Sequence, residues 1–284
     1  MAKSTINEFW NKFIDQSDFQ NEIKEKGYYS SGQPYGRDLY KILKIKLSDG
    51  KKPRPEEDIN KDFWSKQPEP LKKNNFYVMR TGVGKFVIVS KDYYGTCYLD
   101  LKTDNPDFVL HPKPNPSLPN LEKLLSNINN ERTIIPKMKY FGILRQITEI
   151  LDLGTDYYDG PLVRTKKAFP AYLINNSLES EKIDIDSQIE NDYTIYCDNT
   201  IILIELKKDL HLDLGWHKLA YPSMSFSEAI KEKTIKKIIP MYIFQDKNDL
   251  YIYAFENFNF YKDGIELNNS KHMTHTKFFK TTLK

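Results

Sequence analysis

The sequence predicts an α/β (α+β) protein in which helices flank a mixed β-sheet, and three observations carry this prediction. Some segments repeat apolar residues at helical spacing, whereas others are short, β-rich and bounded by turn residues. The second half of the chain follows the order helix, strand, hairpin, helix, strand. Hydrophobic residues make up 39% and charged residues 29% of the 284 residues, which is typical of a globular protein and excludes a disordered chain.

A proline-rich segment marks the expected domain boundary. Residues 105–119 contain Pro106, Pro112, Pro114, Pro116 and Pro119. Prolines at this density remove the backbone donors that a helix or sheet needs, so we expect an extended linker here. The chain is therefore expected to form an N-terminal domain over residues 1–118 and a C-terminal domain over residues 119–284.

The N-terminal domain is expected to be a small module of helices and a hairpin. The pattern predicts helices over residues 6–13 and 37–46, hairpin strands over 76–80 and 85–90, and a further strand over 98–102. This order suits a winged-helix module that would help to read DNA, although many small α+β domains share it.

The C-terminal domain is expected to contain one mixed sheet. The expected elements are helices over residues 120–129 and 137–153, an extended segment over 162–174, strands over 189–196 and 201–207, a helix from Ser225 to Lys236, and strands over 238–245 and 250–256. Gly154 is suited to end the second helix, and Ser225 with Glu228 fits a capping box at the start of the third.

The two central strands are expected to form a hairpin through Asp198 and Asn199, which both tolerate the positive φ angles of a two-residue turn. That turn fixes the register, so Asp192 should lie opposite Glu205 and Glu190 opposite Lys207. Because strand side chains alternate, the four charged groups should share one face, while Ile202, Ile204 and Leu206 occupy the other.

Three carboxylates and one amine on so apolar a hairpin are costly unless they bind something. Paired carboxylate oxygens suit a hard divalent cation such as Mg²⁺. A lysine beside that cation can orient or deprotonate a water molecule for phosphodiester hydrolysis. The alternative is an ordinary amphipathic hairpin whose charged face is exposed. The continuous apolar run Ile201–Ile204, typical of a strand buried on both faces, speaks against that alternative.

The hairpin resembles the PD-(D/E)xK nuclease superfamily, in which an acid at one strand is followed by Glu-x-Lys on the next. The resemblance covers residues 137–260 and implies a restriction-endonuclease-like core. It implies Asp192 and Glu205 as catalytic metal ligands, Lys207 as the catalytic lysine, and Glu190 as a further candidate ligand. Asn191 stands where the superfamily usually has proline. Glu149 and Lys218 lie where members often carry residues that support the site.

Other Glu-x-Lys or Asp-x-Lys triplets lack this context. Glu22-Ile23-Lys24 lies in a polar helical stretch without a facing acid, and the likely partner strand of Asp100-Leu101-Lys102 carries no carboxylate. The hairpin geometry, and not the triplet itself, therefore carries the nuclease prediction.

The net charge of +3 is too small to identify a partner, so clusters of basic residues decide whether DNA is expected. The candidate DNA-binding residues in the N-terminal half are Arg37, Lys41, Lys44, Lys51, Lys52 and Arg54. A second cluster contains Arg164, Lys166 and Lys167. Each cluster fits either a solvated face or a surface that contacts phosphates.

The resemblance implies Mg²⁺-dependent hydrolysis of DNA that leaves 5′-phosphates. A chain of this size without a Walker A sequence looks most like a type II restriction endonuclease, a homodimer that cuts double-stranded DNA and is accompanied by a cognate methyltransferase. The alternatives are a structure-specific repair or junction nuclease and a non-catalytic DNA-binding protein. Two distant cysteines, no signal peptide and no membrane-spanning apolar run favour a cytoplasmic location.

Overall fold

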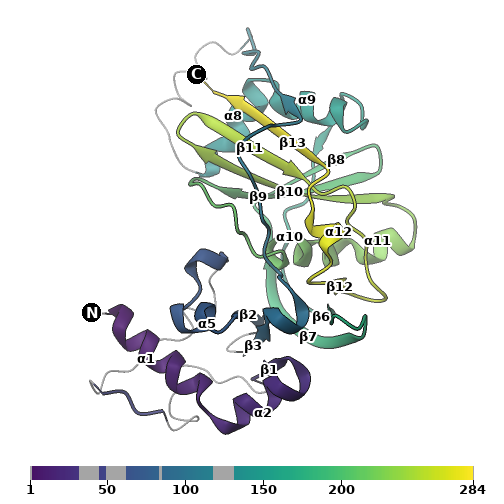
Figure 1. Cartoon of the computed structure of the whole chain (residues 1–284). Coiled ribbons are helices and arrows are strands. Elements are labelled where there is room, and N and C mark those ends of the chain that lie inside the picture. Colours follow the sequence, from purple (N-terminus) through teal and green to yellow (C-terminus); the bar gives the residue numbers. More distant parts are fainter. Residues whose placement is uncertain (1, 32–44, 49–61, 83–84, 118–130, 284) are drawn as a thin grey trace.

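The protein is an α+β structure with two mixed sheets and flanking helices (Figure 1). The computed structural model describes residues 2–31, 45–48, 62–82, 85–117 and 131–283. The six-stranded sheet has the order β1 (Tyr28–Ser30), β3 (Lys85–Ser90), β2 (Phe76–Gly82), β7 (Ser180–Glu190), β6 (Arg164–Ile174) and β12 (Ile265–Glu266). The seven-stranded sheet has the order β4 (Phe108–Val109), β13 (Lys277–Thr282), β11 (Asp249–Ala254), β10 (Lys237–Asp246), β9 (Thr200–Lys207), β8 (Tyr193–Cys197) and β5 (Tyr158–Asp159).

Short helices surround the two sheets. The α-helices are α1 (Ala2–Ile14), α2 (Ser17–Lys26), α5 (Glu69–Lys73), α6 (Lys91–Tyr94), α8 (Ile134–Tyr140), α9 (Ile143–Ile150), α10 (His217–Ala220), α11 (Ser227–Lys231) and α12 (Ser270–Met273). The 3-10 helices are η2 (Trp64–Lys66), η3 (Glu131–Thr133) and η4 (Tyr221–Phe226). None of the described helices is long and apolar enough to span a bilayer.

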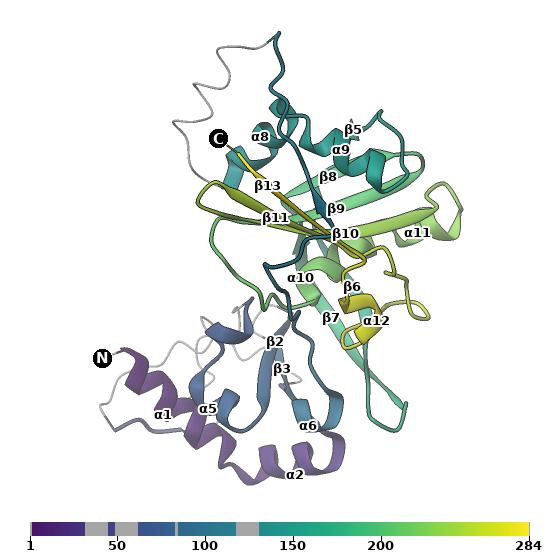
Figure 2. The same cartoon turned by 45° about the horizontal axis from the view of Figure 1, so that its top comes forward.

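Three hydrophobic clusters hold these layers together. Helices α8 and α9 cover the face of the seven-stranded sheet that carries Ile202 and Ile204 of β9 (Figure 2). The opposite face, with Ile201 and Leu203, packs against the apolar face of β6 and β7 and against α10 and η4. Helices α1, α2 and α5 cover the outer face of β2 and β3. The expected alternation of side chains along β9 is therefore confirmed, and the face of β9 that carries Ile201, Leu203 and Glu205 points between the two sheets.

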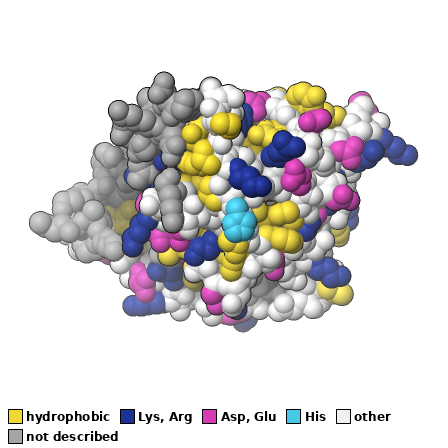
Figure 3. Space-filling view, turned by 90° about the horizontal axis from the view of Figure 1, so that it is seen from above, with side chains coloured by type: hydrophobic (Ala, Val, Ile, Leu, Met, Phe, Trp, Pro, Cys, Tyr) yellow, Lys and Arg dark blue, Asp and Glu magenta, His cyan; other side chains and the backbone are white. Residues whose placement is uncertain are grey.

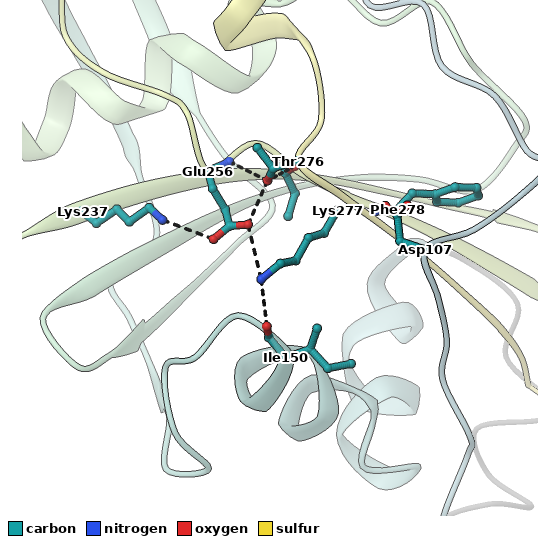
Figure 4. A network of polar contacts seen from close by, with 8 residues as sticks. Asp107, Ile150, Lys237, Glu256, Thr276, Lys277 and Phe278 are labelled. Carbon is teal, nitrogen blue, oxygen red and sulfur yellow. Dashed lines mark hydrogen bonds and ion pairs between the residues drawn. The ribbon is translucent and has the colours of Figure 1, made fainter.

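A partly buried carboxylate connects three elements of the seven-stranded sheet to α9 (Figure 4). Glu256, just after β11, accepts a hydrogen bond from Thr276 at 2.9 Å and forms ion pairs with Lys237 at 3.3 Å and Lys277 at 3.5 Å. Lys277 also donates to the carbonyl of Ile150 at the end of α9, at 2.8 Å. Burial opposes the charge, but Thr276 and the two lysines nevertheless lower the pKa of Glu256.

Several predicted elements are confirmed. Helix α1, the β2–β3 hairpin and strands β6, β9, β10 and β11 lie where the sequence predicts them. The expected helices over residues 37–46 and 120–129 fall mostly or wholly outside the described residues. The cysteines Cys97 and Cys197 are both free and buried.

Other elements differ from the prediction. The expected helix over residues 137–153 is broken into α8 and α9 by Gly142, whose φ of +65° lies in the left-handed region. The segment 98–102 contributes only the isolated bridge of Tyr98 with Gly215. Ser225 lies inside η4, and α11 begins without a side-chain cap, so the predicted capping box is wrong. The single expected sheet is two sheets.

The expected boundary at residue 118 is crossed by both sheets. Strands β1, β2 and β3 join β7 of the six-stranded sheet, and β4, within the proline-rich segment, pairs with β13 at the edge of the other sheet. Leu110 is buried in the same cluster as α8 and α9. The division into residues 1–118 and 119–284 stays a prediction.

Candidate active site

The β8–β9 hairpin has the predicted turn and register. Cys197 pairs with Thr200 and Tyr193 pairs with Ile204, so the turn consists of Asp198 and Asn199. Their φ angles of 42° and 55° are the positive values that such a turn needs. The side chain of Asn199 accepts a hydrogen bond from Tyr196 at 2.7 Å, which further holds the turn.

Asp192 occupies the position just before β8, next to Glu205 in the register. Its backbone N–H donates to the carbonyl of Ile204 at 3.1 Å. Its carboxylate oxygen Oδ2 accepts from the backbone N–H of Leu206 at 2.7 Å. The carboxylate of Asp192 thus takes the place of a backbone acceptor where the β8–β9 pairing ends. The hydrogen bond from Leu206 fixes this carboxylate beside Glu205 and Lys207.

Glu205 and Lys207 form a buried ion pair on the inner face of β9. The Nζ atom of Lys207 donates to Oε1 of Glu205 at 2.6 Å, and the two side chains are 18% and 5% exposed, respectively. Burial raises the pKa of Glu205; nearby Asp192 adds to the rise, while Lys218 and Lys207 oppose it. Burial disfavours the charge of Lys207, but Glu205, Asp192 and Asp62 together raise the pKa of Lys207 to about 12. Lys207 is therefore protonated at neutral pH and suited to orient a water molecule more than to deprotonate one.

Lys218 joins this group from α10, as the sequence predicts for a supporting residue. Its Nζ atom lies 3.9 Å from Oε1 of Glu205 and 3.8 Å from Oδ2 of Asp62. The carbonyl of Asp62 accepts a hydrogen bond from Gly215 at 2.6 Å, which anchors the start of α10. A side chain at Gly215 would clash with the ring of His217, whose Cε1 would lie 2.5 Å from the added Cβ. Asp62 was not predicted, because no pattern in its surroundings distinguishes it from other surface acids.

The prediction that Glu190 faces Lys207 is wrong. Glu190 ends β7 in the six-stranded sheet, where it pairs with Arg164 of β6. The chain changes sheets at Asn191, whose side chain accepts from Val163 N–H at 2.9 Å and donates to Thr194 at 2.9 Å. The expected strand over residues 189–196 is therefore the end of β7 and all but the last residue of β8, with a bend between them. Glu190 instead lines a cavity together with Lys218.

Glu149 is not brought together with the hairpin carboxylates. Its described contact is an ion pair with Arg145 at 3.2 Å, with both side chains about half exposed. Helix α9 packs on the face of β9 opposite to Glu205. Glu149 therefore lies on the solvated side of α9.

The candidate DNA-binding residues have different surroundings. Arg37, Lys41, Lys44, Lys51, Lys52 and Arg54 lie outside the described residues. Lys167 donates to the carbonyl of Met224 and to Ser227, so it ties β6 to η4. Lys166 pairs with Asp186 at 3.0 Å, whereas Arg164 is exposed at the start of β6. On the face shown in Figure 3, basic and acidic side chains are interspersed.

Asp192 and Glu205 are the residues of this site that could hold a divalent cation. Among the described residues, no group of three or more His, Cys, Asp and Glu residues is placed to hold a metal by itself. Mg²⁺ sites that act on phosphates need only one or two carboxylates, because water and the phosphate complete the shell. The site contains two carboxylates, Asp192 and Glu205, and Lys207 and Lys218 place positive charge beside Glu205.

A cavity of about 260 Å³ opens next to this group. Residues 187–190 of β7 form one wall, and His217, Lys218, Tyr221 and Pro222 form another. Asp62 and Arg80 close it from the N-terminal part of the chain. Burial lowers the pKa of His217 to about 4, so the imidazole is neutral at physiological pH.

The charged hairpin and α10 lie within a region that defines a protein family. Residues 96–278 match the family DUF6997, described as a domain of unknown function, and because the match covers more than half of the chain, the protein belongs to this family. Neither the curated proteins nor the solved structures contain a match. The matched region includes Asp192, Glu205, Lys207 and Lys218 but neither Asp62 nor Arg80.

Proposed function

We propose that the protein is a Mg²⁺-dependent nuclease that hydrolyses DNA phosphodiesters at the β8–β9 hairpin. The observation that carries the proposal is the Glu205–Lys207 pair, with a 2.6 Å contact at the inner face of a buried strand, beside Asp192 and Lys218. A buried strand without a ligand-binding role has no need for these charges, because burying them is unfavourable.

The topology around the pair supports a core like that of the restriction endonucleases. Strand β8 pairs antiparallel with β9, and β10 pairs parallel with β9 after the connection that contains α10 and α11. The hairpin, helix, strand part of the order that the superfamily resemblance implies is present, whereas β6 and β7, which precede the hairpin, belong to the six-stranded sheet. Asp192 precedes the first hairpin strand and Glu205-Leu206-Lys207 ends the second, as that resemblance requires.

The residues have distinct roles in this proposal. Asp192 and Glu205 would hold Mg²⁺, which when bound supplies positive charge to the scissile phosphate and acidifies water. Protonated Lys207 would orient the attacking water and stabilise negative charge on the phosphate oxygens. Lys218 would neutralise a neighbouring phosphate oxygen. Glu190 ends β7 in the cavity wall and has no role as a metal ligand in this proposal.

The finer proposal is a type II restriction endonuclease that cuts double-stranded DNA at a defined sequence and leaves 5′-phosphates. Cutting both strands at one site needs two active sites or two events, so we propose a homodimer. A cognate methyltransferase would then protect the host DNA.

The test is cleavage of unmethylated phage DNA and of a branched DNA, with Mg²⁺ or with EDTA, by the wild type and by Glu205→Gln, together with a gel-shift measurement of binding. Glu149→Gln is a matched control, since that carboxylate is exposed and distant from the pair. Discrete fragments that require Mg²⁺ and Glu205, but not Glu149, support the restriction enzyme. If the protein cleaves branched DNA but not linear duplex DNA, the result supports the junction nuclease. Binding without cleavage in the wild type contradicts the catalytic proposal and favours a DNA-binding protein.

A further inference from the structure

The cavity beside Lys218 is lined by four consecutive residues of β7, from Ser187 to Glu190. Side chains of a strand alternate between its faces, so four consecutive lining residues mean that the edge of the strand, with its backbone groups, borders the cavity. The described pairing of β2 with β7 is Gly82 with Asp186, one residue before this wall begins. Apart from β6, no strand within the described part of the chain pairs with residues 187–190, so this wall offers backbone donors and acceptors next to the side-chain amide of Gln188.

The remaining walls combine apolar surface with charges of both signs. Tyr221 and Pro222 of η4 contribute apolar surface. The ring of Tyr221 packs edge-on against the ring of Phe169, with 5.2 Å between the ring centroids. The cations Arg80 and Lys218 are balanced by the acids Asp62 and Glu190. A simple anion site would carry an excess of positive charge, whereas this lining suits a neutral group that is partly apolar and can form hydrogen bonds.

We propose that this cavity receives a single nucleobase of the DNA, unpaired from its partner strand, next to the phosphate that is cut. The inference rests on the nuclease function proposed above. Enzymes that take a base out of the helix hold it in a snug pocket, read its edge by hydrogen bonds, and pack its faces against aromatic or apolar side chains. The β7 edge with Gln188 supplies the hydrogen-bonding wall, and Tyr221 with Pro222 supplies the apolar wall.

The size and position of the cavity agree with this occupant. Pockets for drug-sized ligands measure about 300–1,000 Å³, so 260 Å³ suits a smaller group such as one base. Lys218 lines the cavity and also lies 3.9 Å from Glu205. A base in the cavity would therefore bring its own phosphate to the carboxylate pair, within reach of Lys218.

The experiment is isothermal titration calorimetry in EDTA, so that binding does not depend on the metal. The probes are the four deoxynucleoside 5′-monophosphates and 2-deoxyribose 5-phosphate, which lacks the base. We expect at least one nucleotide to bind tenfold or more tightly than the sugar phosphate. Gln188→Trp, which fills the cavity from an exposed position, should abolish this difference. Lys182→Trp is the matched control on the same exposed face of β7 but outside the cavity, and should leave it unchanged.

The outcomes separate this inference from the nuclease proposal. Equal binding of nucleotides and sugar phosphate, or nucleotide binding that survives Gln188→Trp, overturns the cavity assignment even if the protein cleaves DNA. Glu205→Gln should keep the nucleotide preference while losing cleavage, because Glu205 does not line the cavity. If the wild type binds nucleotides with this preference but never cleaves DNA, the nuclease proposal fails and the base site stands.

Discussion

Replacement of Lys207 by methionine would leave Glu205 as a buried carboxylate without its hydrogen-bonded partner. The Glu205 side chain is 5% exposed, and its Oε1 atom lies 2.6 Å from Nζ of Lys207. At an effective dielectric constant of about 20, Coulomb's law gives an attraction of about 6 kcal/mol at this distance. Desolvation offsets part of this attraction, and removing one partner of a buried pair costs about 3–5 kcal/mol. Lys218 remains 3.9 Å away, so we expect a loss of about 3 kcal/mol at neutral pH.

The loss should depend on pH with a definite sign. Burial already raises the folded-state pKa of Glu205, and removal of the Lys207 charge should raise it further. The ionised carboxylate then opposes folding at all pH values above this raised pKa. As the pH falls through it, the folded variant takes up a proton and the deficit relative to the wild type shrinks.

The assay is urea unfolding between pH 5 and pH 8, followed by tryptophan fluorescence, since Trp10 and Trp216 are fully buried. The double variant Glu205→Gln/Lys207→Met should be more stable than Lys207→Met at pH 8, because it contains no unpaired buried charge. Lys166→Met is the control, since its pair with Asp186 is exposed and should contribute under about 1 kcal/mol. A loss below 1 kcal/mol for Lys207→Met, or one that grows as the pH falls, would refute this reasoning.

Three further variants test the fold around the site. Glu256→Gln should lose about 1–2 kcal/mol at pH 7, because the pKa of Glu256 is lowered in the folded state; the loss should disappear in urea unfolding once the pH falls through that lowered pKa. Asn191→Ala should lose about 2–3 kcal/mol in the same assay and abolish cleavage, since the side chain holds the bend before Asp192; unchanged activity would contradict that role. Gly264→Ala should prevent or strongly weaken folding, because the added Cβ would lie 1.9 Å from the carbonyl oxygen of Pro170. The measurement is thermal unfolding followed by circular dichroism, and a native-like melting curve would show that the loop can shift.

The hairpin could be predicted from the sequence because local features determine it. Asp198 and Asn199 favour the positive φ angles of the turn, and the apolar residues before Glu205 determine which face is buried. Once the turn is fixed, the positions of Asp192, Glu205 and Lys207 follow by counting. The resemblance that gave these residues a role therefore depended on a segment of about 20 residues.

The other features of the site depend on contacts between distant parts of the chain. Glu190 lies in the wrong sheet for the prediction because Asn191 bonds to Val163, a residue 28 positions away. Asp62 lies 3.8 Å from Lys218, although the two residues are far apart in the sequence. No periodic pattern around Asp62 predicts this contact. Strand β7 is an exception, since Ile183, Ile185 and Ile189 alternate with polar residues and could have revealed the strand.

Under the proposed nuclease function, the position of the site between the two sheets would assign catalysis and substrate choice to different parts of the chain. Strand β9 carries the carboxylate and the amine, and both lie within the region that matches the family. Arg80 of β2 and Asp62 close the cavity from outside that region. Because the change of sheet at Asn191 places the end of β7 against the start of β8, Glu190 of the cavity wall is two positions from Asp192, the proposed metal ligand. Changes in the N-terminal segment should therefore alter which DNA is accepted while leaving the Glu205–Lys207 chemistry intact.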